Sequence, residues 1–151
     1  MSISIVSLLP LISVIFVLIL GVFVFLKNRK SKPNIIFFLF SVAITIWLFG
    51  TFMLFNSKID NQAIFWDRFV YLGVILIPSL TYHFGLVFSK TKNPKLLYLG
   101  YFLSFIFLIL SRTDYFVADL FRYEWGVHAK AKIFHHIFLI YFSIYLFLFF
   151  Y

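Results

Sequence analysis

Hydrophobic residues in this chain form long runs that are separated by short polar connections. A helix needs about 20 predominantly apolar residues to cross a bilayer, and five runs reach or approach that length. They are residues 3–26, 34–55, 65–88, 96–110 and 133–151. The fourth is the shortest, but Lys95 and Arg112 at its ends can extend their charged groups to the interface. The pattern predicts an all-α fold, a polytopic bundle of transmembrane helices with about five spans.

The two ends of the chain fall in or beside apolar runs. The first run is interpreted as a retained span and not a cleaved signal peptide, because no basic residue precedes it, it has no small-residue cleavage site, and four basic residues follow it at once. The chain stops at Tyr151 inside an aromatic run with no basic flank. We therefore expect residues 1–151 to be one membrane region, cut within its fifth span and without a soluble domain.

Basic residues set an expected orientation. Seven of the thirteen Lys and Arg residues lie in two acid-free tracts, 27–32 and 90–95. Short basic loops are retained on the cytoplasmic side, so the N-terminus is predicted to lie outside the cell membrane. The other six bases are scattered over connections that also carry all five acidic residues. The density of bases, more than their number, favours this topology.

Composition agrees with the membrane class and excludes several others. The chain is 64% hydrophobic and 12% charged, whereas soluble domains carry about a quarter charged residues. The net charge of +8 favours anionic lipid headgroups as partners over nucleic acid, because the basic residues flank apolar spans. The absence of cysteine excludes disulfides and thiol catalysis.

The third span carries the most structured polar pattern. At about 100° per residue, Arg68, Ser79 and Tyr82 fall on one helical face, with His83 beside them. These four are the candidate residues for lining the bundle and sensing a signal. We expect His83 to be neutral and bonded to a neighbouring helix, the alternative being proton or ligand sensing.

The outer end of this span and its middle invite two further expectations. Trp66 and Tyr71 fit an aromatic belt at the outer interface, and the neighbouring Asp67 and Arg68 are expected to reach water, with ligand contact as the alternative. Pro78 lacks a backbone donor, so a kink is expected between Gly73 and Pro78. That kink is a candidate hinge, and a static packing bend is the alternative.

Other polar positions are assigned to packing. Asn34, Ser41 and Thr45 are possible interhelical partners, and the patch Trp47, Gly50 and Thr51 would allow close helix approach. Residues 116–125 have apolar positions at helical spacing and are expected to form a short interfacial helix.

Catalysis and metal binding find little support. His135 and His136 point about 100° apart on a helix, so they and His128 are not expected to hold a metal. We find no nucleophile with a His partner, no Gly-rich phosphate loop and no paired carboxylates within a span. No catalytic residue, metal or cofactor is expected, and the chain itself is not expected to be an enzyme.

Several aromatic, Gly and Pro positions resemble the N-terminal seven-helix membrane region of bacterial sensor histidine kinases. The resemblance covers the chain from its first span to Tyr151 and rests on Trp47, Trp66-Asp67-Arg68, Tyr71-Leu72-Gly73, Pro78, His83-Phe84 and Trp125-Gly126.

The resemblance implies seven spans, an external N-terminus and a cytoplasmic output, of which this chain would hold five spans. It implies a two-component sensor whose partners are the bilayer, a cytoplasmic kinase module and a second copy in a homodimer. Two alternatives stay open: the same region joined to a cyclic-dinucleotide cyclase or another output, and a stand-alone small transporter or structural membrane protein.

Overall fold

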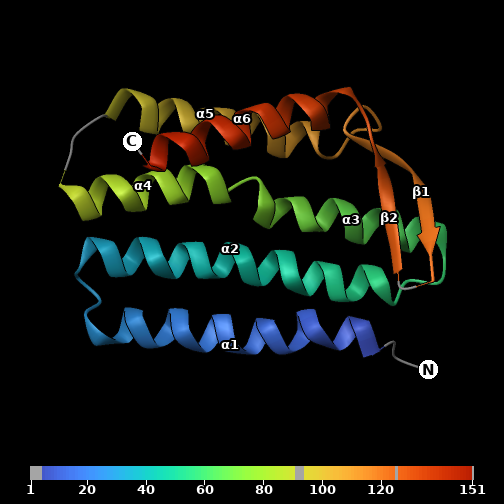
Figure 1. The fold of residues 1–151 in the computed structure, drawn as a ribbon, viewed down its shortest axis with the longest axis horizontal. Helices are drawn as coiled ribbons and strands as arrows, with labels where there is room; N and C mark the ends of the chain where they lie inside the picture. The colour runs from blue at the N-terminus through green and yellow to red at the C-terminus, as the bar shows by residue number, and fades with distance from the viewer. Residues whose placement is uncertain (1–4, 91–93, 125, 151) are drawn as a thin grey trace.

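Six helices and one β-hairpin make up the part of the chain that the structure, a computed structural model, describes, residues 5–90, 94–124 and 126–150 (Figure 1). The helices follow the apolar runs of the sequence. In chain order they are α1 (Ile5–Lys27), α2 (Lys32–Phe55), α3 (Asp60–Val74), α4 (Ile77–Ser89), α5 (Pro94–Leu110), β1 (Val117–Tyr123), β2 (Gly126–Ala131) and α6 (Ile133–Phe150).

The predicted bundle of apolar helices is confirmed. Four helical segments of the described chain are long and apolar enough to cross a membrane: Val6–Lys27, Lys32–Phe55, Asp60–Ser89 and Ile133–Phe150. The fourth predicted run forms the shorter apolar helix Pro94–Leu110. The third run is divided into α3 and α4 and begins five residues earlier than expected. The chain is therefore a multi-pass membrane protein.

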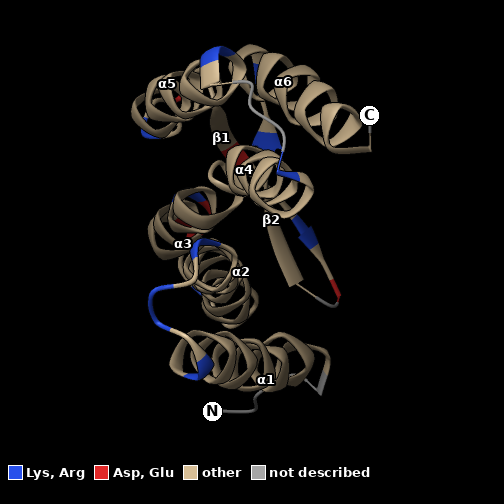
Figure 2. Ribbon diagram, turned by 90° about the vertical axis from the view of Figure 1, so that its left-hand side faces the viewer, with Lys and Arg blue, Asp and Glu red and all other residues tan. Residues whose placement is uncertain are grey.

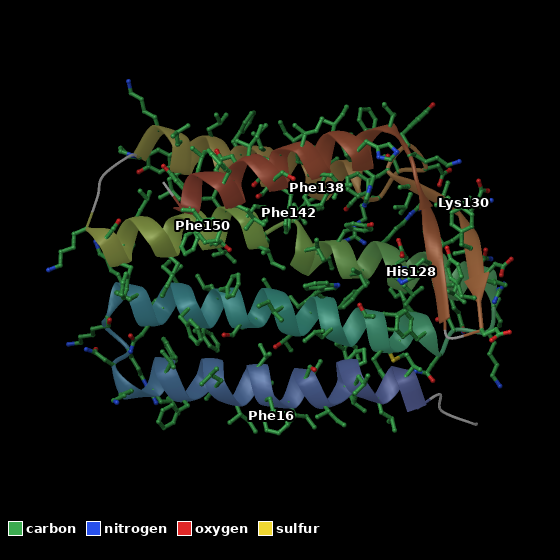
Figure 3. The ribbon with its side chains drawn as sticks, viewed as in Figure 1. Phe16, His128, Lys130, Phe138, Phe142 and Phe150 are labelled. Atoms are coloured by element: carbon green, nitrogen blue, oxygen red, sulfur yellow. The ribbon has the colours of Figure 1, made fainter. Side chains whose placement is uncertain are left out.

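The helices lie side by side with nearly parallel axes, in the order α1, α2, then α3 with α4, then α5 with α6 (Figures 1 and 2). Helix α2 packs against α1 on one side and against α3 and α4 on the other. The outer face of α1 is apolar and exposed, with Leu9, Phe16 and Phe23 at 66%, 69% and 63% exposure. Figure 3 shows Phe16 projecting away from the bundle, as a lipid-facing side chain does.

Helices α2 and α3 approach closely at two glycines. A Cβ atom added at Gly73 would collide with the Ala43 carbonyl oxygen and lie 2.8 Å from the Trp47 backbone nitrogen. One added at Gly50 would lie 2.9 Å from Cγ2 of Val70. Small residues at helix contacts let backbones pack directly in membranes. The predicted role of Gly50 in close packing is therefore confirmed, and Gly73 has the same role.

The prediction of an interfacial helix over residues 116–125 is wrong. Strands β1 and β2 form an antiparallel hairpin there, with Val117 opposite Ala131 and Tyr123 opposite Gly126. The register shifts between Ala118 and Leu120, where Asp119 adopts a positive φ of 56°. Such a bulge adds one residue to the strand, so inward-facing side chains become three positions apart and mimic helical spacing. Trp125 lies outside the described residues.

The two ends of the bundle differ in charge. The α1–α2 connection, with Arg29 and Lys30, and the start of α5, with Lys95, lie at one end, where Figure 2 shows blue without red in the foreground. The hairpin and the α2–α3 turn lie at the other end (Figure 1), which holds the acidic residues. Lys92, counted in the second basic tract, lies outside the described residues.

Candidate functional site: polar side chains along the bundle

The third span is kinked at its centre. Helix α3 ends at Val74 and α4 begins at Ile77, with Pro78 in the first turn of α4. Ile75 and Leu76 keep right-handed helical angles, with φ and ψ of −66° and −27° and of −81° and −22°. The interruption is thus a kink between two helices and lies in the interval from Gly73 to Pro78 where the sequence predicts it.

A buried hydroxyl network surrounds this kink. Ser104 Oγ of α5 donates to the Ile75 carbonyl oxygen at 3.1 Å and lies 2.9 Å from Ser79 Oγ. Tyr141 Oη of α6 lies 2.7 Å from Ser79 Oγ and 2.9 Å from Ser104 Oγ, and it donates to the Gly100 carbonyl oxygen at 3.1 Å. The network therefore joins α4, α5 and α6 and satisfies a carbonyl at the kink, as nonregular backbone in a membrane requires.

Two of the four predicted lining residues, Ser79 and Tyr82, lie in the core beside this network. Tyr82 is 5% exposed, and its ring centre lies 5.6 Å from that of Tyr145 in an edge-on contact. Tyr145 Oη donates to the Leu96 carbonyl oxygen at 2.7 Å. Sequence reasoning missed Ser104 and Tyr141. Their only signal was a hydroxyl group within a mainly apolar run, a feature shared by other residues of the same runs.

His83 has its partner on a neighbouring helix, as expected. Its Nδ1 lies 2.8 Å from Tyr101 Oη of α5. The two rings meet edge-on with centres 5.8 Å apart. His83 lies on α4 beyond the hydroxyl network, toward the end of the bundle that carries the basic connections. The pair therefore links α4 to α5 between the kink and the end of the bundle that carries the basic connections.

Arg68 and its neighbour Asp67 form a second polar cluster near the hairpin. Arg68 pairs with Asp114 and also donates to the Val117 carbonyl oxygen at 3.3 Å. Asp67 is only 4% exposed, so the prediction that it reaches water is wrong. The hairpin covers it, and Asp67 Oδ1 accepts the Ala129 backbone N–H at 3.3 Å.

Tyr71 also lies deeper than predicted. Its ring is not part of an outer aromatic belt but packs edge-on against Phe116 and Phe138, with centres 4.9 and 6.3 Å apart. The sequence pattern could not show this because Phe116 comes from the connection before β1, which folds back over α3 and α6. The kinked third span therefore carries two polar clusters. One is the hydroxyl network at Ser79 of α4, and the other is formed by Asp67 and Arg68 of α3 near the hairpin.

Further ion pairs fasten the hairpin. Arg122 of β1 pairs with Asp60 at the start of α3, and Lys132 Nζ lies 3.1 Å from Asp119 Oδ2. These pairs are exposed and contribute little to stability individually. Burial, together with the positive charge of Arg68, lowers the pKa of Arg112 in the connection after α5. Of these pairs, Arg122 with Asp60 joins the hairpin to α3.

A cavity of about 270 Å³ lies under the hairpin. Asp67 and His135 both contribute to its wall, and Asp67 Oδ2 and His135 Nδ1 are buried with no hydrogen-bond partner among the described residues. Figure 3 shows Phe138 and Phe142 reaching from α6 and His128 from β2. The lining comes from α2, α3, β2 and α6: Trp47, Thr51, Leu54, Asp67, Val70, Tyr71, Val74, His128, His135, Phe138, Leu139 and Phe142.

Further polar side chains lie on the histidine-containing segments and on the second span. Within the described residues, no group of three or more His, Cys, Asp or Glu side chains is placed to hold a metal. Asn34 Nδ2 donates to the Val24 carbonyl oxygen of α1 at 2.8 Å, an interhelical bond. Ser41 is buried but bonds within its own helix, to the Phe37 carbonyl oxygen at 2.9 Å. Ser41 therefore contributes to packing, and its hydroxyl makes no interhelical hydrogen bond to the described residues.

Comparison with known proteins assigns this arrangement to a family. A family model described as the N-terminal 7TM region of histidine kinase matches residues 9–151. The chain belongs to that family. Membership agrees with the resemblance in the third span and places the chain in the non-catalytic input part of histidine kinases, within the 7TM region. Searches of curated proteins and of solved structures gave no match.

Proposed function

We propose that this 7TM region is the sensory input of a two-component histidine kinase and that it transmits signals through the kink between α3 and α4. The observation that carries the proposal is the family match over residues 9–151. The full-length protein would then add the remaining spans of a seven-span region and a cytoplasmic kinase module, and it would work as a homodimer.

The proposed orientation puts the hairpin outside the cell and the α1–α2 and α4–α5 connections in the cytoplasm. Basic residues without acids flank those two connections, and every acidic residue belongs to the opposite end. Retention of short basic loops in the cytoplasm supports this assignment. A signal at the hairpin would then have to pass the kink to reach the kinase.

The kink is suited to transmission because it divides two differently held halves. Helix α3 packs through Gly73 directly on the backbone of α2, while α4 is bonded through Ser79 to α5 and α6. A switch needs an element with two accessible arrangements. In this proposal the kink, where the Ile75 carbonyl oxygen accepts a hydrogen bond from Ser104, is that element.

The test replaces Pro78 by Ala in the full-length kinase. Alanine restores a backbone N–H that can donate to the Val74 carbonyl oxygen, so the kink should straighten and the basal rate of autophosphorylation should change severalfold. Pro10→Ala in α1 is the matched control, since Pro10 also lies within a helix but on the periphery of the bundle.

The readout is autophosphorylation in membrane vesicles at equal protein amounts. Unchanged basal and stimulated output after Pro78→Ala, and also after Gly73→Ala, would remove the hinge from the proposal. Equal effects of Pro10→Ala and Pro78→Ala would show that the response is not specific to the kink.

A further inference from the structure

The cavity under the hairpin has the composition of a ligand site. Its volume of about 270 Å³ exceeds the 150 Å³ or so that accommodates benzene in an apolar protein cavity. It is lined mainly by aromatic and aliphatic side chains, with one carboxylate and two imidazoles among them. Small-molecule sites are built this way, with an apolar wall and a few polar groups that fix orientation.

The polar groups in this wall are incompletely satisfied. The Asp67 side chain is 6% exposed, and its Oδ2 atom has no hydrogen-bond partner among the described residues. His135 Nδ1 is also buried without a partner in that part of the chain. A buried carboxylate oxygen without a donor is costly, so a ligand that brings a donor would gain from binding there.

The charges around the cavity favour a positive ligand. The adjacent Arg68 pairs with Asp114 and donates to the Val117 carbonyl oxygen, and within the described part of the chain no hydrogen bond joins it to Asp67. Among the described residues, neither lysine nor arginine contributes to the cavity wall. His128 Nδ1 lies 3.9 Å from Asp67 Oδ1, on the oxygen that already accepts the Ala129 N–H. The second oxygen, Oδ2, is the one that has no hydrogen-bond partner among the described residues.

Aromatic rings in the cavity wall also suit a positively charged ligand. The indole of Trp47 and the rings of Tyr71, Phe138 and Phe142 contribute to the same wall. Aromatic faces attract cations, and a carboxylate with several aromatic side chains is a common environment for an organic ammonium group. An inorganic cation is less suitable, because the wall offers few oxygen ligands.

We propose that the cavity binds a small organic ammonium ion that donates to Asp67 and packs its apolar part against Trp47, Tyr71 and Phe138. The binding site is inferred from the cavity itself. The idea that the bound ammonium ion is the stimulus of the kinase rests on the proposed function. A ligand here would contact α3 just before the kink, together with α6 and the hairpin.

The binding experiment uses the full-length protein in nanodiscs of zwitterionic lipid and two probes of equal shape. The probes are 2-phenylethylammonium and neutral 2-phenylethanol, titrated by calorimetry with empty nanodiscs as the blank. The ammonium probe should saturate and bind about tenfold or more tightly than the alcohol, because only the cation forms a charge-assisted bond with Asp67.

Two variants identify the carboxylate as the cause. Asp67→Asn keeps the acceptor for Ala129 and should remove the preference for the ammonium probe, while Asp60→Asn, which changes an exposed carboxylate outside the cavity, should leave it intact. No saturation with the ammonium probe, equal affinity for both probes, or an unaltered preference in Asp67→Asn would overturn the site.

Kinase output separates this inference from the proposed function. Specific binding without any change in autophosphorylation would retain the site and refute its sensory role. Absence of binding, together with a change in output after Pro78→Ala, would refute the site and leave the proposed transmission through the kink in place.

Discussion

The hydroxyl groups of Ser79, Ser104 and Tyr141, in the middle of this bundle, find their partners inside the protein, because hydrocarbon offers none. Tyr141 is the clearest case, since its Oη atom is within hydrogen-bond distance of Ser79, Ser104 and the Gly100 carbonyl oxygen. Through it, one residue of α6 contacts α4 just after the kink and also α5. Its hydroxyl should therefore matter for stability beyond the apolar packing of its ring.

Tyr141→Phe keeps the ring and removes only this hydroxyl. We expect the free energy of unfolding to fall by about 1 kcal/mol, as is usual for interhelical hydrogen bonds in membranes. Tyr98→Phe on α5 is the control, because the Tyr98 side chain is largely exposed. Denaturation of the two variants in mixed detergent micelles gives the comparison, and equal stability would contradict a structural role for the Tyr141 hydroxyl.

For single residues, the sequence predicts which side chains face the bundle better than it predicts the partners of those side chains. The helical period identified Ser79 and Tyr82 as inward-facing, and the position of His83 within a span predicted a partner on a neighbouring helix. Asp67 was misplaced because a period within one helix contains no information about a distant hairpin that covers it. Partners contributed by other helices, such as Tyr141, require the tertiary arrangement.

Among the elements, the hairpin depends on one unusual residue. Asp119 sits at the bulge with a φ of 56°, a left-handed conformation that Asp tolerates and that β-branched residues avoid. The bulge also sets the register that places Ala129 over Asp67. The conformation of this residue is therefore connected to the covering of the cavity.

Asp119→Val and Asp119→Gly both remove the pair with Lys132 but differ in backbone preference. Valine should destabilise the hairpin by roughly 1–2 kcal/mol relative to glycine, because its branched Cβ opposes positive φ. Amide hydrogen exchange in β1 and β2 measures the difference, with faster exchange expected in the valine variant. Similar exchange in both variants would mean that the bulge conformation is not limiting.

The hairpin also shows why the elements were only partly predictable. Long apolar helices were recognised since their length alone distinguishes them, and Pro78 located the kink. A bulged strand of seven residues, in contrast, imitates the spacing of a short amphipathic helix. Strand pairing between β1 and β2 decided the outcome, and pairing is not visible in one segment.

For the whole molecule, the unequal charge of its two ends gives a direct test of orientation. The chain contains no cysteine, so single cysteines can be introduced into it without removing native ones. Lys58→Cys, in the α2–α3 turn, should react with a membrane-impermeant maleimide in intact cells. Lys30→Cys, in the α1–α2 connection, should react only after permeabilisation. The reverse pattern would invert the proposed topology.

The membrane class and the grouping of charged connections followed from composition and run length, which are properties of the whole sequence. The order of helices across the bundle did not, because apolar faces in lipid carry little information about their neighbours. Close contacts such as that of Gly73 with α2 depend on small residues whose partners are set only when the helices pack.

That contact has a mechanical consequence. Because α3 is seated on the backbone of α2 immediately before the break, the proposed hinge would make α4 a lever arm that pivots near Ile75. Its 13 residues extend about 20 Å, so rotating the arm by about 10° would displace its far end by roughly 3 Å. Lys90, at that end, would carry the displacement into the loop that leads to α5.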